Sequence, residues 1–90
     1  MPKIKLSQVF QSYFGGQVYF TSESTTLTKI LKEMVERHPQ LAGKVCDQEG
    51  HLMPFIHAII DGEVMDLSKG QDRELHQNST ITLLNAIAGG

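Results

Sequence analysis

The residues with the most distinctive chemistry stand at the end of the sequence, where "LLNAIAGG" (83–90) runs from strand-like hydrophobic residues into two glycines. Neither Gly89 nor Gly90 has a Cβ, and glycine accepts a backbone φ of either sign, so this segment could pass through a narrow opening in another protein. Ile87 and Ala88, which precede the pair, are compact and uncharged. An α-carboxyl group has a pKa of about 3.3 to 3.7, so it is ionised in the cell and must be activated before it can react as an electrophile.

The other side chains that often carry chemistry form no recognisable metal or redox site. The histidines are scattered, without an HExxH-type pair or a cysteine cluster, so we expect no metal site; they are His38, His51, His57 and His76. Cys46 is the only cysteine, which excludes an intramolecular disulfide and any CxxC motif. We expect a small buried residue there, because free cysteine is usually buried, and a reactive thiol is the alternative.

The motifs of an independent enzyme are also missing from the sequence. Gly15 and Gly16 lack the lysine and the serine or threonine of a phosphate-binding loop, and "HLMPF" does not resemble a nucleophile elbow. Asp61, Glu63 and Asp66 are close in sequence, but a solvated hairpin explains them more simply than a catalytic carboxylate cluster. We therefore do not expect the chain to be an enzyme by itself.

Composition narrows the choice of partners. The 90 residues are 40% hydrophobic and 20% charged, which is typical of one small globular domain. A net charge of -2 and a pI of about 6.0 leave no basic stripe for a phosphate backbone, so nucleic acid is not an expected partner. No stretch approaches the roughly 20 continuous apolar residues of a membrane helix, and "MPKIKLSQVFQ" does not read as a signal peptide. We expect a soluble, cytoplasmic protein that does not bind membranes.

The clearest local pattern is an amphipathic helix in "STTLTKILKEMVERHPQ". Its apolar residues follow the i, i+3, i+4, i+7, i+8 spacing of one helix face, and they are Leu27, Ile30, Leu31, Met34 and Val35. Hydroxyl groups of Ser24, Thr25 and Thr26 could cap its first turn. Pro39 disfavours helical geometry at His38, so the helix should end near that residue.

Strand-like segments surround this helix. "KIKL" (3–6) and "QVYF" (17–20), which follows Gly15 and Gly16, are expected to form an N-terminal hairpin. A second hairpin is expected in "FIHAIIDGEVM" (55–65), where Asp61-Gly62 is a dipeptide favoured in tight turns. "STITLLNAIA" (79–88) is the last expected strand and leads into the terminal glycines.

Alternation along residues 55–60 predicts two faces for that strand. The aliphatic set Ile56, Ala58 and Ile60 suits a face covered by the helix. The other set is Phe55, His57 and Ile59, which we expect on the open face as a partner-binding surface. The alternative is that loops of the same chain cover these three residues.

The order of these elements, the "DGE" hairpin and above all the closing "ITLLNAIAGG" resemble the ThiS/MoaD family of ubiquitin-like sulfur carriers. The resemblance spans essentially the whole chain. "FGG" before the second strand and "VCDQEGHLMPFIHAIIDGEV" are most similar to sulfur carriers of cysteine synthesis and to stand-alone MoaD-like proteins. The resemblance implies an α+β fold of the β-grasp (ubiquitin-like) class, with a mixed sheet and one main helix across one face. The expected organisation is a β-grasp domain over residues 1–86 and a flexible Gly-Gly tail over residues 87–90.

The resemblance also implies a function for the tail. In this family the last glycine is adenylated by a ubiquitin-activating-like adenylyltransferase and then converted to a thiocarboxylate. Gly90 would be the reacting residue with Gly89 beside it, and Ile87 and Ala88 would contact the partner. A downstream sulfur acceptor enzyme, in cofactor or cysteine biosynthesis, would be the second partner. The chain itself is expected to bind no cofactor, because the ATP is used by the activating partner.

Three other functions remain open from the sequence. The chain could be the small subunit of a molybdopterin synthase, whose thiocarboxylate feeds an enzyme's active site. It could be a ubiquitin-like modifier that is joined to lysines of other proteins. It could also be a plain interaction domain in which the two glycines are incidental.

Overall fold

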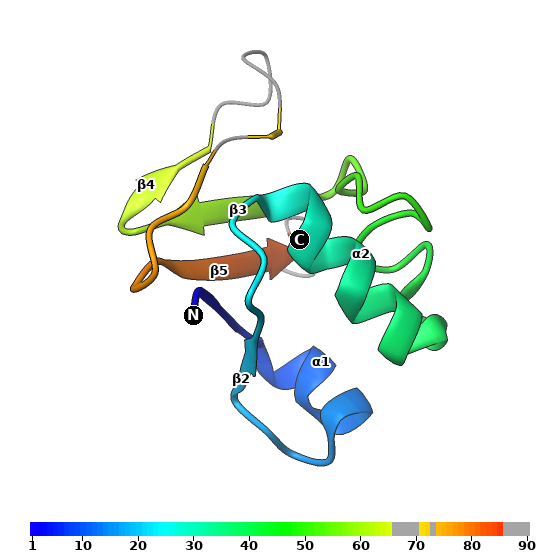
Figure 1. Cartoon of the computed structure of the whole chain (residues 1–90). Coiled ribbons are helices and arrows are strands. Elements are labelled where there is room, and N and C mark those ends of the chain that lie inside the picture. Colours follow the sequence, from blue (N-terminus) through cyan, green and yellow to red (C-terminus); the bar gives the residue numbers. More distant parts are fainter. Residues whose placement is uncertain (66–70, 73, 86–90) are drawn as a thin grey trace.

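The computed structural model describes residues 1–65, 71–72 and 74–85, which form a five-stranded sheet with one long helix across one face (Figure 1). The elements in chain order are β1 (Lys3–Lys5), α1 (Gln8–Gln11), the 3-10 helix η1 (Ser12–Phe14), β2 (Tyr19–Thr21), α2 (Leu27–Arg37), the 3-10 helix η2 (Pro39–Leu41), β3 (Ile56–Ile60), β4 (Glu63–Val64) and β5 (Thr80–Asn85). The expected α+β class, with a main helix over one face of the sheet, is confirmed.

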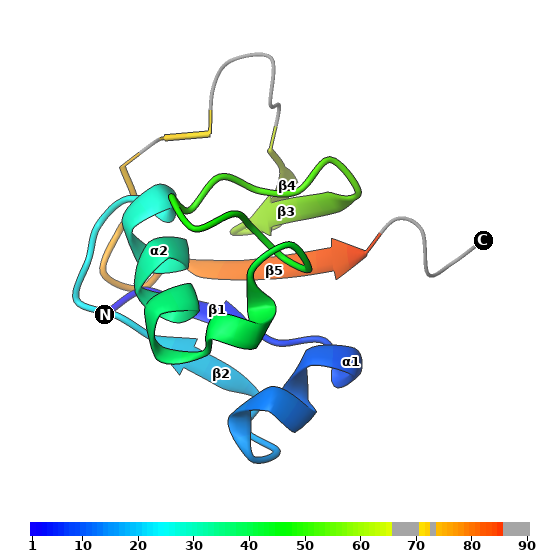
Figure 2. The ribbon, with the colours of Figure 1, turned by 90° about the vertical axis from the view of Figure 1, so that its right-hand side faces the viewer.

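The sheet is mixed, as expected. Its strand order is β2-β1-β5-β3-β4, which Figure 2 shows from bottom to top. β1 and β5 are parallel, whereas β1 with β2, β3 with β5, and β3 with β4 are antiparallel. The last strand in the sequence is therefore the central strand of the sheet.

Helix α2 contributes its whole apolar face to the core. The five residues that the spacing predicted are all buried, and they are Leu27, Ile30, Leu31, Met34 and Val35. They pack against the inward residues of the strands, Ile4, Phe20, Ile56, Ala58, Ile60, Ile81 and Leu83. The helix ends at Arg37, and Pro39 then opens η2, so the predicted end of the helix is confirmed.

The expected hydroxyl cap of α2 is wrong. Thr26 is the N-cap residue, but its side chain makes no capping hydrogen bond. The chain before the helix is held in another way. Thr26 forms a β-bridge with Glu74, and the Thr25 carbonyl accepts a hydrogen bond from the Leu75 N–H (2.7 Å). Backbone pairing with a distant segment thus takes the place of a local side-chain cap.

The second hairpin is confirmed. Asp61 and Gly62 form its turn with φ values of 50° and 89°, so both residues adopt the left-handed backbone that this turn needs. Asp61 also ties the turn to β5, because its N–H donates to the Thr80 carbonyl (3.0 Å) and its Oδ1 accepts from the Thr80 N–H (2.9 Å).

The connection between β1 and β2 differs from a simple hairpin. The two strands pair as expected, but α1 and η1 lie between them, before the turn at Gly15 and Gly16. Phe10 and Phe14 from these two short helices are buried in the core. The connection therefore adds core volume as well as reversing the chain.

The connection from α2 to β3 is fastened to the helix by Gln71. Its Nε2 donates to the carbonyl of Gly50 (2.6 Å) and to Thr28 Oγ1 (3.1 Å), and its Oε1 accepts from the Leu52 N–H (2.7 Å). Cys46 in the same connection is fully buried, as expected.

Candidate functional site

The expected reactive end of the chain lies beyond β5. Ile87, Ala88, Gly89 and Gly90 are outside the described residues, as is the expected domain boundary after residue 86. The structure does describe the strand that leads to them. β5 lies between β1 and β3, and its last residue, Asn85, pairs with Ile56. The residues after Asn85 therefore follow directly on the central strand of the sheet.

The two faces of β3 are arranged as the alternation predicted. Ile56, Ala58 and Ile60 are buried against the helix layer, with exposed fractions of 0%, 2% and 3%. On the opposite, open face, His57 is exposed and Ile59 is half-buried. The orientation of this strand is therefore confirmed.

Phe55 departs from the expectation. It precedes β3, is half-buried and packs against the hydrophobic core, so it does not stand on the open face as a strand residue. The reason is that β3 begins only at Ile56, and the alternation of a strand does not extend to the residue before it. Phe55 therefore contributes to packing at the start of the strand.

Neighbouring strands extend the open face around His57 and Ile59. Leu84 of β5 lies opposite His57, and Val64 of β4 lies opposite Ile59. Leu84 is 45% exposed and Val64 is 68% exposed. Side chains directly opposite each other on neighbouring strands are in contact range, so these four residues form one continuous surface. We call His57, Ile59, Val64 and Leu84 the open-face patch.

The reasoning from sequence missed Val64 and Leu84, although both could have been found. Once Leu83 is assigned to the core, alternation along β5 sends Leu84 to the other face. A two-residue turn at Asp61-Gly62 likewise fixes the register of the second hairpin, which places Val64 beside Ile59.

The open face is basic on one side of the patch. Ile4 of β1 points into the core, so Lys3 and Lys5 are on the open face, where Lys5 lies across from Thr82. The Lys3 Nζ lies 4.6 Å from the centre of the Tyr19 ring. Among the described strand residues that share this face, none is acidic. The face thus combines an apolar patch with a positively charged border.

The described residues offer a partly exposed apolar surface and little reactive chemistry. Burial raises the pKa of the Cys46 thiol from 9.0 to about 11, and the nearby Asp47 carboxylate adds to the effect. In the part of the chain that the structure describes, no three His, Cys, Asp or Glu side chains are placed to hold a metal ion. The described helices also include none that is long and apolar enough to span a bilayer.

Comparisons with known proteins agree with this architecture. The sequence model of the ThiS family matches residues 8–90. A chain of the Amycolatopsis orientalis BexX/CysO complex aligns over 100% of both chains with 23% identity and a TM-score of 0.81. CysO from Mycobacterium tuberculosis aligns over 96% of this chain and 99% of its own, with 17% identity and a TM-score of 0.78.

SAMP1 from Haloferax volcanii covers 99% of this chain and 98% of its own, with 21% identity and a TM-score of 0.71. These similarities in structure show the β-grasp, ubiquitin-like fold. The comparison with curated proteins finds no match.

Proposed function

Because the chain belongs to the ThiS family, we propose that it is a ubiquitin-like sulfur carrier and that Gly90 carries the sulfur. The observation that supports this proposal best is the Gly89-Gly90 end of a sequence whose fold is that of the β-grasp proteins. In this role the chain is a co-substrate of other enzymes and supplies no catalytic group of its own.

The proposed chemistry begins with the Gly90 carboxylate. One of its oxygens attacks the α-phosphorus of ATP in the active site of a ubiquitin-activating-like adenylyltransferase, and pyrophosphate leaves. A sulfur nucleophile at the oxidation level of sulfide then attacks the acyl carbon, and AMP leaves. The product is a thiocarboxylate, which a downstream acceptor enzyme uses as its sulfur source. Gly89 allows this slender end to reach both active sites.

We propose the open-face patch as the surface that the adenylyltransferase binds. Val64 and Leu84 are exposed and Ile59 is half-buried between them on paired strands, and contiguous apolar groups at the surface mark interaction sites. Leu84 belongs to β5, the strand that leads to the tail, so binding at the patch would also position the tail. The similar structure from Amycolatopsis orientalis is that of a BexX/CysO complex, which supports a protein partner.

The decisive test is the intact mass of the protein purified from its own cells under conditions that preserve thiocarboxylates. We expect a fraction in which one oxygen at the C-terminus has been replaced by sulfur, and tandem mass spectrometry should place the change at Gly90. Exchange of labelled pyrophosphate into ATP, catalysed by the adenylyltransferase and dependent on this chain, would measure the first step alone. Absence of both signals would contradict the proposal.

A modifier function is the second candidate, because the chain is similar in fold to SAMP1, which is named a small archaeal modifier protein. It would use the same adenylated tail, and a lysine amine would replace sulfur as the nucleophile. Peptides from cell lysates that carry the Gly89-Gly90 remnant on lysine would support this function. Tight association of the tail with a large synthase subunit would favour the molybdopterin synthase function instead.

A further inference from the structure

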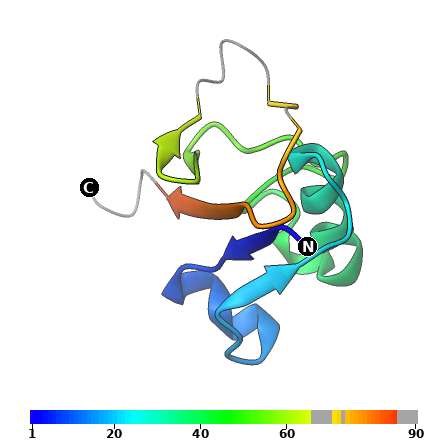
Figure 3. The ribbon, with the colours of Figure 1, turned by 60° about the vertical axis from the view of Figure 1, so that its left-hand side comes forward.

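Strand β1, which lies between β2 and β5, brings two lysine side chains to the open face of the sheet (Figure 3). Ile4 between them is fully buried, so Lys3 and Lys5 share the opposite face. A two-residue step along a strand places their Cα atoms roughly 7 Å apart. Neither lysine forms an ion pair with the described residues. Two like charges therefore lie close together on this face, and no described carboxylate neutralises them.

The ring of Tyr19 on β2 joins these two lysines. Lys5 lies opposite Tyr19 in the pairing of β1 with β2, and the Lys3 Nζ lies 4.6 Å from the centre of the same ring. Because an ammonium group has three N–H donors, Lys3 can still donate to an acceptor from another protein while it contacts the ring. We call Lys3, Lys5 and Tyr19 the basic border.

The basic border is continuous with the open-face patch. Lys5 lies opposite Thr82 of β5, and Thr82 in turn lies opposite Ile59 of β3. Two strand spacings separate Lys5 from Ile59, which is about 10 Å between their Cα atoms. An interface of standard size buries about 800 Å² on each partner. A protein that covers the patch therefore also covers the basic border.

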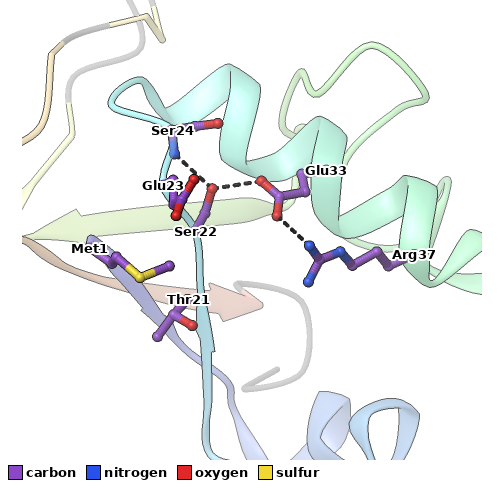
Figure 4. Close-up of a pocket in the computed structure, with 7 residues that line it drawn as sticks. All are labelled: Met1, Thr21, Ser22, Glu23, Ser24, Glu33 and Arg37. Carbon is purple, nitrogen blue, oxygen red and sulfur yellow. Dashed lines mark hydrogen bonds and ion pairs between the residues drawn. The ribbon is translucent and has the colours of Figure 1, made fainter.

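The acidic side chains beyond the edge of β2 do not cancel the charge of the basic border. Glu33 pairs with Arg37 (3.1 Å), and Glu23 lines the same hollow as Met1, which carries the positively charged α-amino group (Figure 4). These four charges balance among themselves. The basic border thus keeps its two positive charges, although the chain as a whole has a net charge of -2.

We propose that the basic border binds carboxylate side chains of the adenylyltransferase, so that the enzyme's surface beside the open-face patch is acidic. This inference rests on the proposed function, because it names the chemistry of the partner surface that this function requires. Complementary charges at the rim of an interface speed association and disfavour wrong partners, which an apolar patch cannot do alone. Nucleic acids and anionic membranes fit less well, because proteins bind them through larger clusters of basic residues.

The first test measures the association of the full chain with its cognate adenylyltransferase by stopped flow. The variant Lys3→Gln/Lys5→Gln removes both charges of the basic border, and Lys29→Gln/Lys32→Gln is the matched control on the exposed side of α2. At low salt we expect the first variant to associate at least fivefold more slowly and to dissociate at nearly the same rate, because rim charges act mainly on association. The control should change association less than twofold, and salt near 1 M should remove the difference.

The second test uses the unchanged protein, so it does not depend on the folding of a variant. The carbodiimide EDC activates carboxylates, and a lysine amine in contact with one then forms an amide bond as the reagent leaves as its urea. Mass spectrometry of the digested complex should find Lys3 or Lys5 joined to aspartate or glutamate residues of the enzyme. Lys29 and Lys32 should form no such link.

The outcomes separate this proposal from the proposed function. Equal association of the two double variants, or cross-links only from Lys29 or Lys32, would overturn the acidic partner surface, while pyrophosphate exchange would still support the sulfur carrier. Absence of exchange with the unchanged protein would remove the proposed function and this inference with it. Vesicles containing phosphatidylserine that bind the unchanged protein but not Lys3→Gln/Lys5→Gln, with association to the enzyme unaffected, would assign the basic border to a membrane surface instead.

Discussion

Leu31 lies in the middle of the buried face of α2 and has no exposed surface. Leu31→Ala should lower the free energy of unfolding by roughly 2 to 5 kcal/mol, because it removes buried apolar atoms and leaves a cavity. Leu84→Ala is the matched control, since the same side chain is lost from the exposed face of β5. Urea denaturation would measure both changes. A loss below about 0.5 kcal/mol for Leu31→Ala would mean that the wrong helix face has been assigned to the core.

Gly50 is a second residue at which substitution should be costly. It has a φ of 88°, and a Cβ built on it would overlap the backbone carbonyl oxygen of Thr28 in α2. Gly43 has a similar φ of 84°, but a Cβ there would meet no atom within 4 Å. Both alanine variants should therefore lose about 1 to 2 kcal/mol from the left-handed backbone, and Gly50→Ala should lose clearly more. Equal losses in urea denaturation would show that the contact with α2 relaxes freely.

Cys46 should be inert in the folded protein. Its pKa of about 11 exceeds the usual 9.0, so the folded state holds the thiol proton more tightly than the unfolded state does. The resulting stability is fully present below pH 9.0 and is lost as the pH rises toward about 11. At pH 8 a disulfide reagent such as DTNB should label the thiol much more slowly in buffer than in urea. Equally fast labelling in both would restore the reactive-thiol interpretation.

At the scale of elements, the sequence predicts the long helix and the faces of β3, but it does not predict the shortest helix or the contacts between distant segments. The five-residue apolar stripe of α2 and the alternation of β3 are long enough to be recognised in the sequence. Helix α1 has only four residues, too few for a periodic pattern. Phe10 in α1 and Phe14 in η1 are four residues apart and both are buried, and this spacing could have indicated the two short helices.

Contacts between distant segments lie beyond local patterns altogether. Gln71 joins the connection at Gly50 to Thr28, and the pairing of Thr26 with Glu74 replaces the expected hydroxyl cap. Neither interaction involves residues near each other in the sequence. The open-face patch was likewise predictable only in part. Alternation shows which residues of one strand share a face, but the continuity of the patch depends on how neighbouring strands are aligned.

The open-face patch gives a prediction at this scale. Ile59→Asp should leave the fold largely intact, because Ile59 is only half-buried, and it should weaken binding to the adenylyltransferase by placing an unpaired carboxylate in the interface. Ile60→Asp, one residue further along β3, puts the same charge into the core and should unfold the protein. Circular dichroism and a binding titration would separate the two effects. Unchanged binding by a folded Ile59→Asp variant would remove the patch from the proposed interface.

At the scale of the whole molecule, one residue of the patch lies on β5, the strand that precedes the proposed reactive end. Leu84 is six residues before Gly90, and six residues span at most roughly 20 Å when fully extended. An adenylyltransferase that binds the patch, as proposed, would therefore have to place its nucleotide within about this distance of the surface that contacts Leu84.

The sharpest prediction separates function from stability. Deleting Gly90, or replacing Gly89 with valine, should abolish adenylation while hardly changing the melting temperature. The deletion removes no side chain, and the last core residue in the described part of the chain is Leu83. Gly89→Val is the more informative change, because it keeps the terminal glycine carboxylate and adds only the bulk of a β-branched side chain. Pyrophosphate exchange would measure the loss, with Asn85→Ala as a control that leaves the tail intact. If both tail variants exchange pyrophosphate as fast as the unchanged protein, Gly90 is not the residue that is activated.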